Sequence, residues 1–411
     1  MSRFNISTNH PIIPNSQEYT MEKKYVSIHS EDRDITRFPN SADFEIELPE
    51  DYYNVQSIQL LNWAFPANYD TFSILRSNIS MSFKITDPYN PGKYESNNPL
   101  LNVIFQALYN HINDLYFFTI ASGFYNPIQM ATELTNKFND AVTNVILQYF
   151  YDNSTTIPNK DVLLQQFIKQ GYYNQFVIVY NSVEQNLWFG NKSSNFVLTN
   201  QNQLKLSNTI QTILCNLEKL PESTNWGLPY YLGFSLCPAY ANASTINPLS
   251  GEMIYPRFYY GDAFYLTGDN GYWLKPDPEY KGGVVYYLNA PSKINLMGDS
   301  YIYMEIAGQN NIDETSPFNV SKFTIETNQT NGIVNSSFAK IAVVTTPISQ
   351  WFDYSSEITK VHNPPLERIR RLKIKLRYHN NQIVNFGNFD YSFTLIFHVF
   401  RSQINRNYNI N

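Results

Sequence analysis

The sequence predicts a mainly β protein, a jelly-roll-like antiparallel β-sandwich with inserted α-helices and long loops. Aromatic residues make up 16% of the 411 residues, with 32 Tyr and 28 Phe, and such residues favour strands. Alternating apolar and polar residues recur towards both ends of the chain, whereas helical spacing occurs in the middle. Turn-forming Pro, Gly, Asn and Asp residues separate these segments.

The N-terminal quarter contains the strand pattern around which this fold is organised. Residues 25–28 are aromatic and β-branched, and a charged turn at residues 30–34 follows them. Residues 44–48 alternate apolar and acidic side chains, which is typical of a strand with one face in water. After a turn at residues 49–51, a more apolar strand runs from residue 55 to residue 66. Such a sheet requires a second layer to cover it.

The middle of the chain mixes strand and helix patterns. The clearest helix begins after Asn126, a capping residue followed by Pro127 at the first helical position, and its apolar residues recur every three or four positions to Tyr149. Further helices are predicted after Pro99, at 161–170 and at 209–220, and strands at 79–85, 116–120, 175–180, 186–190 and 195–199.

Strand patterns return near the C-terminus, at residues 301–306, 338–344, 372–378 and 391–400. The last of these is apolar on both sides, so we expect a central strand covered on both faces. A hairpin-like link at residues 380–382 is expected between the last two strands.

These patterns predict one large β domain with polar ends. The organisation is an extended N-terminal arm at 1–24, a sandwich at 25–400 with helical insertions around 99–170 and 204–220 and a loop-rich stretch at 221–287, and a polar tail at 401–411. The arm is either a disordered tail or a segment that becomes ordered against a neighbour.

Charge and cysteine content exclude several classes of protein. A net charge of −6 argues against a general nucleic-acid binder, which would be basic. The two cysteines, Cys215 and Cys237, give no disulfide framework, and the sequence shows neither a secretory signal nor a span of about 20 apolar residues. An uncharged polar, Tyr-rich surface suits packing into an assembly, although a Tyr-rich core explains the composition equally well.

Catalytic and metal-binding patterns are absent from the sequence. The six histidines lack metal-ligand spacing, and no nucleophile elbow, dinucleotide or P-loop motif occurs, so we expect no enzyme, no cofactor and no metal. Glu31, Asp32 and Asp34 form the one notable carboxylate cluster. A turn with local hydrogen bonds is favoured over a Ca²⁺ site, because Arg33 would repel a cation.

One basic segment and three aromatic residues are the candidate partner-binding sites. The basic residues are Arg368, Arg370, Arg371, Lys373, Lys375 and Arg377, and the last three share one face of a strand. They form either a solvated face that protects a sheet edge or a contact with an acidic protein or an anionic membrane; no aromatic stacking set favours nucleic acid. Tyr259, Tyr260 and Trp273 lie in the loop-rich stretch, where partner contacts are common.

Two stretches together resemble a known group of proteins. The first is S-E-D-R-D…F-P-N-S-A-D-F-E-I-E-L-P…N-V-Q-S-I-Q-L-L-N-W-A-F-P at residues 30–66, and the second is L-K-I-K-L-R…V-N-F-G-N-F-D-Y-S-F-T-L-I-F at 372–397. Phe124-Tyr125 and Leu232-Gly233-Phe234 are weaker points of similarity. The chain resembles minor capsid or capsid-associated virion proteins of the nucleocytoplasmic large DNA viruses, the giant viruses. The middle of the chain departs from this pattern.

The resemblance implies a structural function. It implies a jelly-roll-like protein in many copies in an icosahedral shell, bound to the major capsid protein and other minor capsid proteins, and assembled in the host cytoplasm. The inner membrane is an alternative contact for the basic strand. The alternative function is a carbohydrate- or host-surface-binding β-sandwich of a viral fibre or spike, in which residues such as Trp226 and Trp273 stack on sugars.

Overall fold

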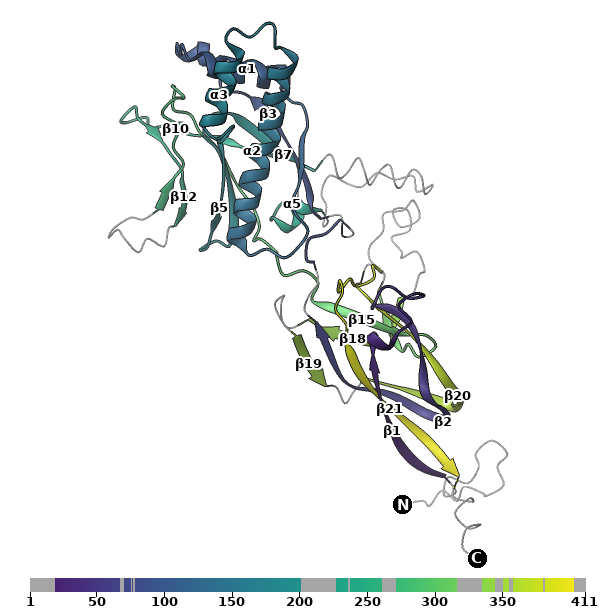
Figure 1. Ribbon diagram of the computed structural model, residues 1–411. Helices are drawn as coiled ribbons and strands as arrows, with labels where there is room; N and C mark the ends of the chain where they lie inside the picture. Colours follow the sequence, from purple (N-terminus) through teal and green to yellow (C-terminus); the bar gives the residue numbers. More distant parts are fainter. Residues whose placement is uncertain are drawn as a thin grey trace, which may run out of the picture. The chain divides into compact units, whose positions relative to one another are not determined.

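The chain forms two compact units, each with a hydrophobic core of its own. The computed structural model in Figure 1 describes residues 19–66, 70–74, 76, 78–200, 227–235, 237–260, 271–315, 335–343, 350–354, 358–379 and 381–402. Unit 1 contains the described residues up to Asp70 and from Asp299 onward, and unit 2 contains those between Thr71 and Gly298. The described strands pair in antiparallel sheets and helices are few, which confirms the predicted mainly β sandwich class.

Unit 1 is built on a seven-stranded, curled sheet with the order β1-β21-β2-β20-β15-β18, in which β19 also pairs with β2. Its strands are β1 (Tyr19–His29), β2 (Asp43–Pro66), β15 (Tyr301–Ile306), β18 (Ala339–Ala342), β19 (Gln350–Tyr354), β20 (Thr359–Arg377) and β21 (Ser392–Ser402). The 3-10 helix η2 (Ser30–Asp32) and a two-stranded sheet of β16 (Ile312–Glu314) and β17 (Asn335–Ser337) complete the described part. β21 lies between β1 and β2, as its apolar sequence predicts.

The long strands of unit 1 differ from the prediction. The turn expected at residues 49–51 lies within β2, where the register with β20 shifts between Glu47 and Tyr52; such irregularities bend a strand without ending it. The expected hairpin-like link is present, since the Tyr378 N–H donates to the Gln382 carbonyl at 2.8 Å and Arg377 forms an antiparallel bridge with Ile383. It does not pair β20 with β21, because β2 separates these two strands. β1 begins at Tyr19, so the last residues of the predicted arm belong to the sheet, and residues 1–18 lie outside the described residues.

Unit 2 contains two four-stranded sheets, β4-β3-β7-β8 and β5-β6-β14-β9, and two two-stranded sheets, β10-β11 and β12-β13. Its strands are β3 (Ser80–Asp87), β4 (Tyr116–Thr119), β5 (Phe176–Asn181), β6 (Asn186–Asn191), β7 (Asn195–Thr199), β8 (Ala239–Tyr240), β9 (Asn242–Ala243), β10 (Thr245–Ile246), β11 (Met253–Ile254), β12 (Arg257–Tyr260), β13 (Gly271–Trp273) and β14 (Tyr286–Asn289). Its helices are η3 (Pro91–Tyr94), α1 (Pro99–Asn110), α2 (Pro127–Asp152), α3 (Lys160–Lys169) and α5 (Leu228–Tyr231).

Unit 2 gives the middle of the chain an organisation that the sequence did not indicate. Residues expected to be insertions into one sandwich bury their apolar side chains against each other instead. Described parts of the stretch 221–287, predicted to be loops, include α5 and the short strands β8 to β13. The helix predicted at 209–220, within the insertion 204–220, lies outside the described residues, as does most of the tail 401–411.

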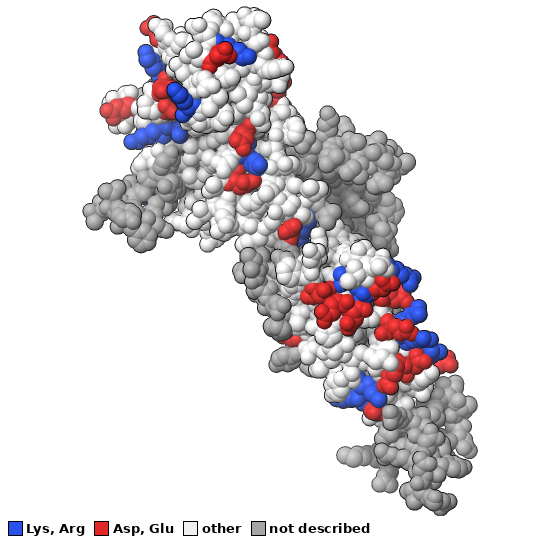
Figure 2. Space-filling view, viewed as in Figure 1, with Lys and Arg blue, Asp and Glu red and all other residues white. Residues whose placement is uncertain are grey.

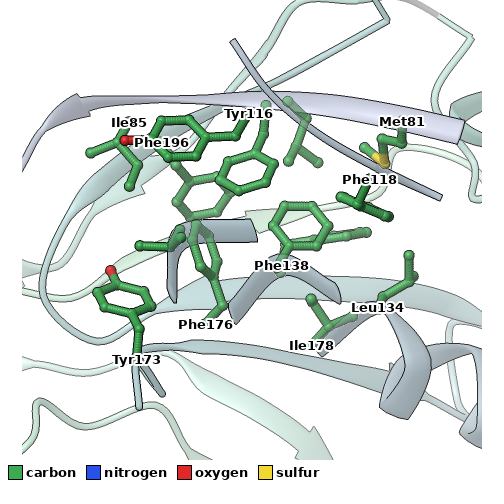
Figure 3. Close-up of a cluster of buried hydrophobic side chains, with 14 of the residues drawn as sticks. Met81, Ile85, Tyr116, Phe118, Leu134, Phe138, Tyr173, Phe176, Ile178 and Phe196 are labelled. Carbon is green, nitrogen blue, oxygen red and sulfur yellow. The ribbon is translucent and has the colours of Figure 1, made fainter. Parts of the chain in front are cut away.

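Helix α2 is central to the core of unit 2. Its N-terminus has the predicted cap, a capping box in which the Asn126 side chain accepts from the Gln129 N–H and the Gln129 side chain accepts from the Asn126 N–H. Figure 3 shows Phe138 of α2 among aromatic side chains from the surrounding strands. Its ring centroid lies 4.5 Å from that of Phe83 on β3 and 5.0 Å from that of Phe176 on β5.

The same helix also covers an open edge of a sheet. In its sheet, β5 pairs only with β6, so its other edge presents backbone groups that need partners. Asn139 Nδ2 donates to the Phe176 carbonyl at 2.9 Å and Asn139 Oδ1 accepts from the Phe176 N–H at 3.0 Å. One turn earlier, Thr135 Oγ1 accepts a hydrogen bond from the Ile178 N–H at 3.0 Å and donates one to the Ile178 carbonyl at 3.2 Å. Two side chains of a helix therefore replace a neighbouring strand.

We expect the change Asn139→Ala to lower the free energy of unfolding of unit 2 by about 2–6 kcal/mol, because two backbone groups of the buried Phe176 lose partners worth about 1–3 kcal/mol each. Urea unfolding monitored by circular dichroism measures this. The control is Asn144→Ala on the exposed side of α2, where the stability should stay within about 0.5 kcal/mol. Equal effects of the two changes would show that Asn139 does not protect the edge.

Candidate interaction surface

The basic segment of β20 lies beside an acidic segment of β2. We call this surface the charged ladder; its residues are Glu45, Glu47 and Asp51 of β2 and Arg368, Arg370, Arg371, Lys373 and Lys375 of β20. The antiparallel register places Glu45 opposite Lys373 and Glu47 opposite Arg371. Figure 2 shows red and blue atoms next to each other along this part of unit 1. Carboxylates therefore interrupt the predicted basic patch.

Three ion pairs join the two strands of the charged ladder. Arg368 Nη2 lies 2.6 Å from Asp51 Oδ2, Arg370 Nη2 lies 2.6 Å from Glu47 Oε1, and Arg371 Nη1 lies 3.6 Å from Glu45 Oε1. The partners are largely exposed, and exposed pairs contribute only about 0–1 kcal/mol each. The ladder thus adds little to stability and carries a mixed pattern of charge, five cations and three carboxylates, that a complementary protein surface can recognise.

The three residues predicted to share a face have different environments. Lys373 is exposed, Lys375 is half-buried with its Nζ 4.0 Å from Glu305 Oε2, and Arg377 is fully buried. Arg377 cannot contact a partner while this fold is intact, so its assignment as a partner-binding residue is wrong. Period-two alternation correctly places the three on one face, but β16 and β17 cover the end of that face.

Arg377 forms a buried cluster with two carboxylates. Its Nη2 donates to Glu314 Oε1 at 2.5 Å, its Nε donates to Glu305, and its Nη2 also donates to the Ser336 carbonyl at 3.3 Å. Burial alone lowers the pKa of the guanidinium, but hydrogen bonds to Glu314 and Glu305 outweigh it, so the net shift of the pKa is upward. Because Glu314 ends β16 and Ser336 lies in β17, this cluster fastens the two-stranded sheet to β20 and β15.

The aromatic candidates lie in unit 2 and not with the charged ladder. Trp273 ends β13, is 40% exposed, and pairs with Arg257 of β12. Tyr259 and Tyr260 lie on β12 opposite Tyr272 and Gly271. The structure therefore divides the predicted partner-binding residues between two units.

The carboxylates of the charged ladder are the residues that the sequence analysis missed. Glu45 and Glu47 alternate on β2 as Arg371 and Lys373 do on β20, and opposite charges on facing strands favour pairing. This complementary alternation was a usable signal, but it required knowing that two segments more than 300 residues apart are neighbours.

The carboxylate cluster after β1 is a turn, as the favoured interpretation predicts. Asp34 Oδ1 accepts hydrogen bonds from the Thr36 N–H at 3.0 Å and from Thr36 Oγ1 at 2.6 Å. Arg33 Nη1 lies 2.5 Å from Asp390 Oδ1, which ties the turn to the segment before β21. In the part of the chain that the structure describes, no three His, Cys, Asp or Glu side chains are grouped to hold a metal, and no helix is long and apolar enough to cross a membrane.

His398 makes the stability of unit 1 dependent on pH. Burial, and then the charge of Lys23, lower its pKa below the usual 6.5, and its Nδ1 lies 2.9 Å from Ser57 Oγ. As the pH falls below 6.5 the unfolded chain binds this proton before the folded chain does, so the free energy of unfolding decreases. We expect His398→Gln to reduce this slope in urea unfolding between about pH 7 and pH 5. The exposed His111→Gln serves as the control, and an unchanged slope in His398→Gln would contradict the assignment.

No known family model matches the chain, and no curated protein is similar to it. Among solved structures, the crystal structure of selenomethionine-labelled mavirus penton protein is similar with a TM-score of 0.35 and 6% sequence identity. The alignment covers 93% of this chain and 99% of the penton protein. A likeness this weak carries no conclusion about fold or function.

Proposed function

We propose that this chain is a structural virion protein without enzymatic activity, a minor capsid component that binds neighbouring subunits in the icosahedral shell of a large DNA virus. The proposal rests on the sequence resemblance at residues 30–66 and 372–397, and both stretches lie in unit 1. In the sheet these two stretches occupy β2, the C-terminal end of β20 and the first part of β21. The resemblance therefore concerns one sheet, not scattered segments.

The observation that carries the proposal is the position of the chain ends. Tyr19, the first residue of β1, is the register partner of Ser402, the last residue of β21. The described part of unit 1 therefore begins and ends at adjacent positions in the sheet. β1 is at the end of the strand order, and Met21 and Tyr25 on it are 55% and 62% exposed. An edge strand with exposed apolar side chains and a chain segment beside it suits strand pairing with a neighbouring subunit.

The choice of contact partner for the charged ladder is supported by the carboxylates that lie among its cations. An anionic membrane attracts surfaces with a clear excess of Lys and Arg. Here Glu45, Glu47 and Asp51 pair with the arginines, which supports the major capsid protein or another minor capsid protein as the partner in place of the inner membrane. Binding of unit 1 to anionic vesicles but not to capsid protein would reverse this assignment.

Truncation tests the role of the N-terminal segment. Because β1 begins at Tyr19, the deletion must remove residues 1–18 only; removal of residues 1–24 would also take away part of β1. We expect the truncated protein to keep its circular dichroism spectrum and unfolding midpoint, and to be lost from purified particles. The matched control is deletion of residues 403–411. Normal incorporation of the 1–18 deletion would refute the arm hypothesis, and absence of the full-length chain from intact particles would refute the virion assignment.

A second candidate function is binding to carbohydrate on a host surface, as a fibre or spike component. It is favoured by Trp273, a residue of β13 that is 40% exposed; the other proposed stacking residue, Trp226, lies outside the described residues. Release of the chain from particles by treatments that strip external fibres would favour this function. Retention of the chain in particles that have been stripped of external fibres and treated with mild detergent would favour the capsid function.

A further inference from the structure

A surface pocket lies within unit 2, apart from the residues that the sequence analysis singled out. Three segments far apart in the sequence form it: the end of β3 with η3, the link between β6 and β7, and the segment that leads into β14.

The pocket carries an excess of positive charge. Lys93, Lys192 and Lys281 line it, and Asp87 is the only carboxylate among its lining residues. Within the described residues, none of the three lysines forms an ion pair, in contrast to the arginines of the charged ladder. Three lysines and one carboxylate around one small site leave an excess of positive charge, which favours an anionic ligand.

Tyrosine hydroxyls provide neutral hydrogen-bond donors beside these lysines. Tyr89, Tyr94, Tyr280 and Tyr286 line the pocket. Burial, then the charges of Asp87 and Tyr94, raise the pKa of Tyr286 to about 12, and burial also raises the pKa of Tyr89 and Tyr280. These phenols stay protonated at neutral pH, so each can donate to a hydroxyl or an oxyanion.

The walls of the pocket are fixed before any ligand binds. The rings of Tyr89 and Tyr94 stack with centroids 5.5 Å apart at an angle of 9°, and the Tyr89 N–H donates to Ser194 Oγ at 3.1 Å. Gly282 has a φ of +104°, and a Cβ there would lie 2.3 Å from Tyr94 Cε1, so only glycine permits this approach. A preorganised site loses less free energy to ordering on binding.

We propose that this pocket binds an anionic saccharide, a sugar ring that carries a carboxylate or sulfate group. The lysines suit the acidic group, and the tyrosines suit the ring, because their hydroxyls match sugar hydroxyls and their aromatic carbons match its C–H surface. A bare sulfate would leave the aromatic carbons of the tyrosines without a partner, and a nucleic-acid strand would require an extended basic groove with aromatic stacking. The proposal concerns unit 2 alone and does not depend on the virion role of the chain.

Ligand-observed NMR and isothermal titration calorimetry with the full-length chain test the proposal. The probes are the methyl glycoside of N-acetylneuraminic acid, a sulfated disaccharide, methyl galactoside as the neutral sugar, sodium sulfate and adenosine monophosphate. We expect one or both acidic sugars to bind at least about tenfold more tightly than methyl galactoside and sulfate. The affinity for the acidic sugars should fall as the ionic strength rises from about 0.05 M to about 0.5 M. The carboxylated and sulfated probes identify which acidic group is preferred.

Variants locate the binding site. The double change Lys93→Gln and Lys281→Gln should weaken binding of the acidic sugar about tenfold or more, because it removes two cations from the pocket. Both side chains are exposed, so their loss leaves the core intact. Lys169→Gln on α3, an exposed lysine outside the pocket, is the matched control and should bind normally. Unchanged binding by the double variant, equal binding of neutral sugar or sulfate, tighter binding of adenosine monophosphate, or no binding of either acidic sugar would each overturn the proposal.

Discussion

Replacing Arg377 with Gln is expected to destabilise unit 1 by about 3–5 kcal/mol, because breaking a buried ion pair leaves an uncompensated buried charge. Glu314 is only 4% exposed, and Arg377 is the cation beside it in the buried cluster. The same change removes the donors to the carbonyls of Ser336 and Tyr378. Urea unfolding measures the loss, and amide hydrogen exchange in β16 and β17 should rise first, since the cluster holds these strands to the sheet.

Two further variants separate this effect from a general effect of charge. Arg370→Gln removes a cation of the charged ladder, 57% exposed and paired with Glu47, and should cost less than about 1 kcal/mol. Arg377→Met combined with Glu314→Leu removes both charges and should recover most of the loss, because apolar pairs often replace buried ion pairs without penalty. A single Arg377→Gln change within about 1 kcal/mol of the natural protein would contradict the buried-cluster assignment.

Replacing Phe138 with Ala is expected to destabilise unit 2 by about 3–5 kcal/mol, because it removes a buried aromatic side chain and leaves a cavity. The ring is fully buried and contacts Phe83, Phe118, Phe176 and Phe189, with centroid distances between 4.5 and 5.9 Å. Figure 3 shows it beside Phe118 and Phe176. Helix α2 and strand β5 should become the first described elements of unit 2 to exchange their amide protons, since Phe138 joins them.

The control for this change lies on the same helix. Tyr151 of α2 is 75% exposed, so Tyr151→Ala should change the free energy of unfolding by no more than about 0.5 kcal/mol. Phe138→Leu should lower the free energy of unfolding less than Phe138→Ala does, because the leucine side chain fills part of the cavity. If Phe138→Ala and Tyr151→Ala lowered the stability of unit 2 equally, the core of unit 2 would not centre on α2.

Local elements were predictable to a large extent. Helix α2 and its cap followed from Asn126, Pro127 and the apolar spacing, and β3, β6 and β7 followed from alternation and turn residues. Boundaries were less predictable where tertiary pairing extended a strand. β20 continues back to Thr359 through a segment that contains two prolines, because β2 supplies partners along most of its length.

The candidate site was predicted in part. The basic residues do lie on a strand and mostly at the surface, but local period cannot tell an exposed arginine from one covered by another segment. Arg368 and Arg370 are exposed, whereas β16 and β17 cover Arg377. The lysines of the pocket gave no signal at all, because Lys93, Lys192 and Lys281 come from segments that meet only in the folded unit.

By itself, the sequence determined the fold class, the identity of most helices and strands, and the apolar character of β21, because each depends on side-chain spacing within one segment. Tertiary structure alone decided that the middle of the chain forms its own unit, that β2 separates β20 from β21, and which charges meet. The physical reason is that an ion pair, a covered sheet edge or a pocket depends on which distant segments become neighbours, and one segment's periodicity does not contain that information.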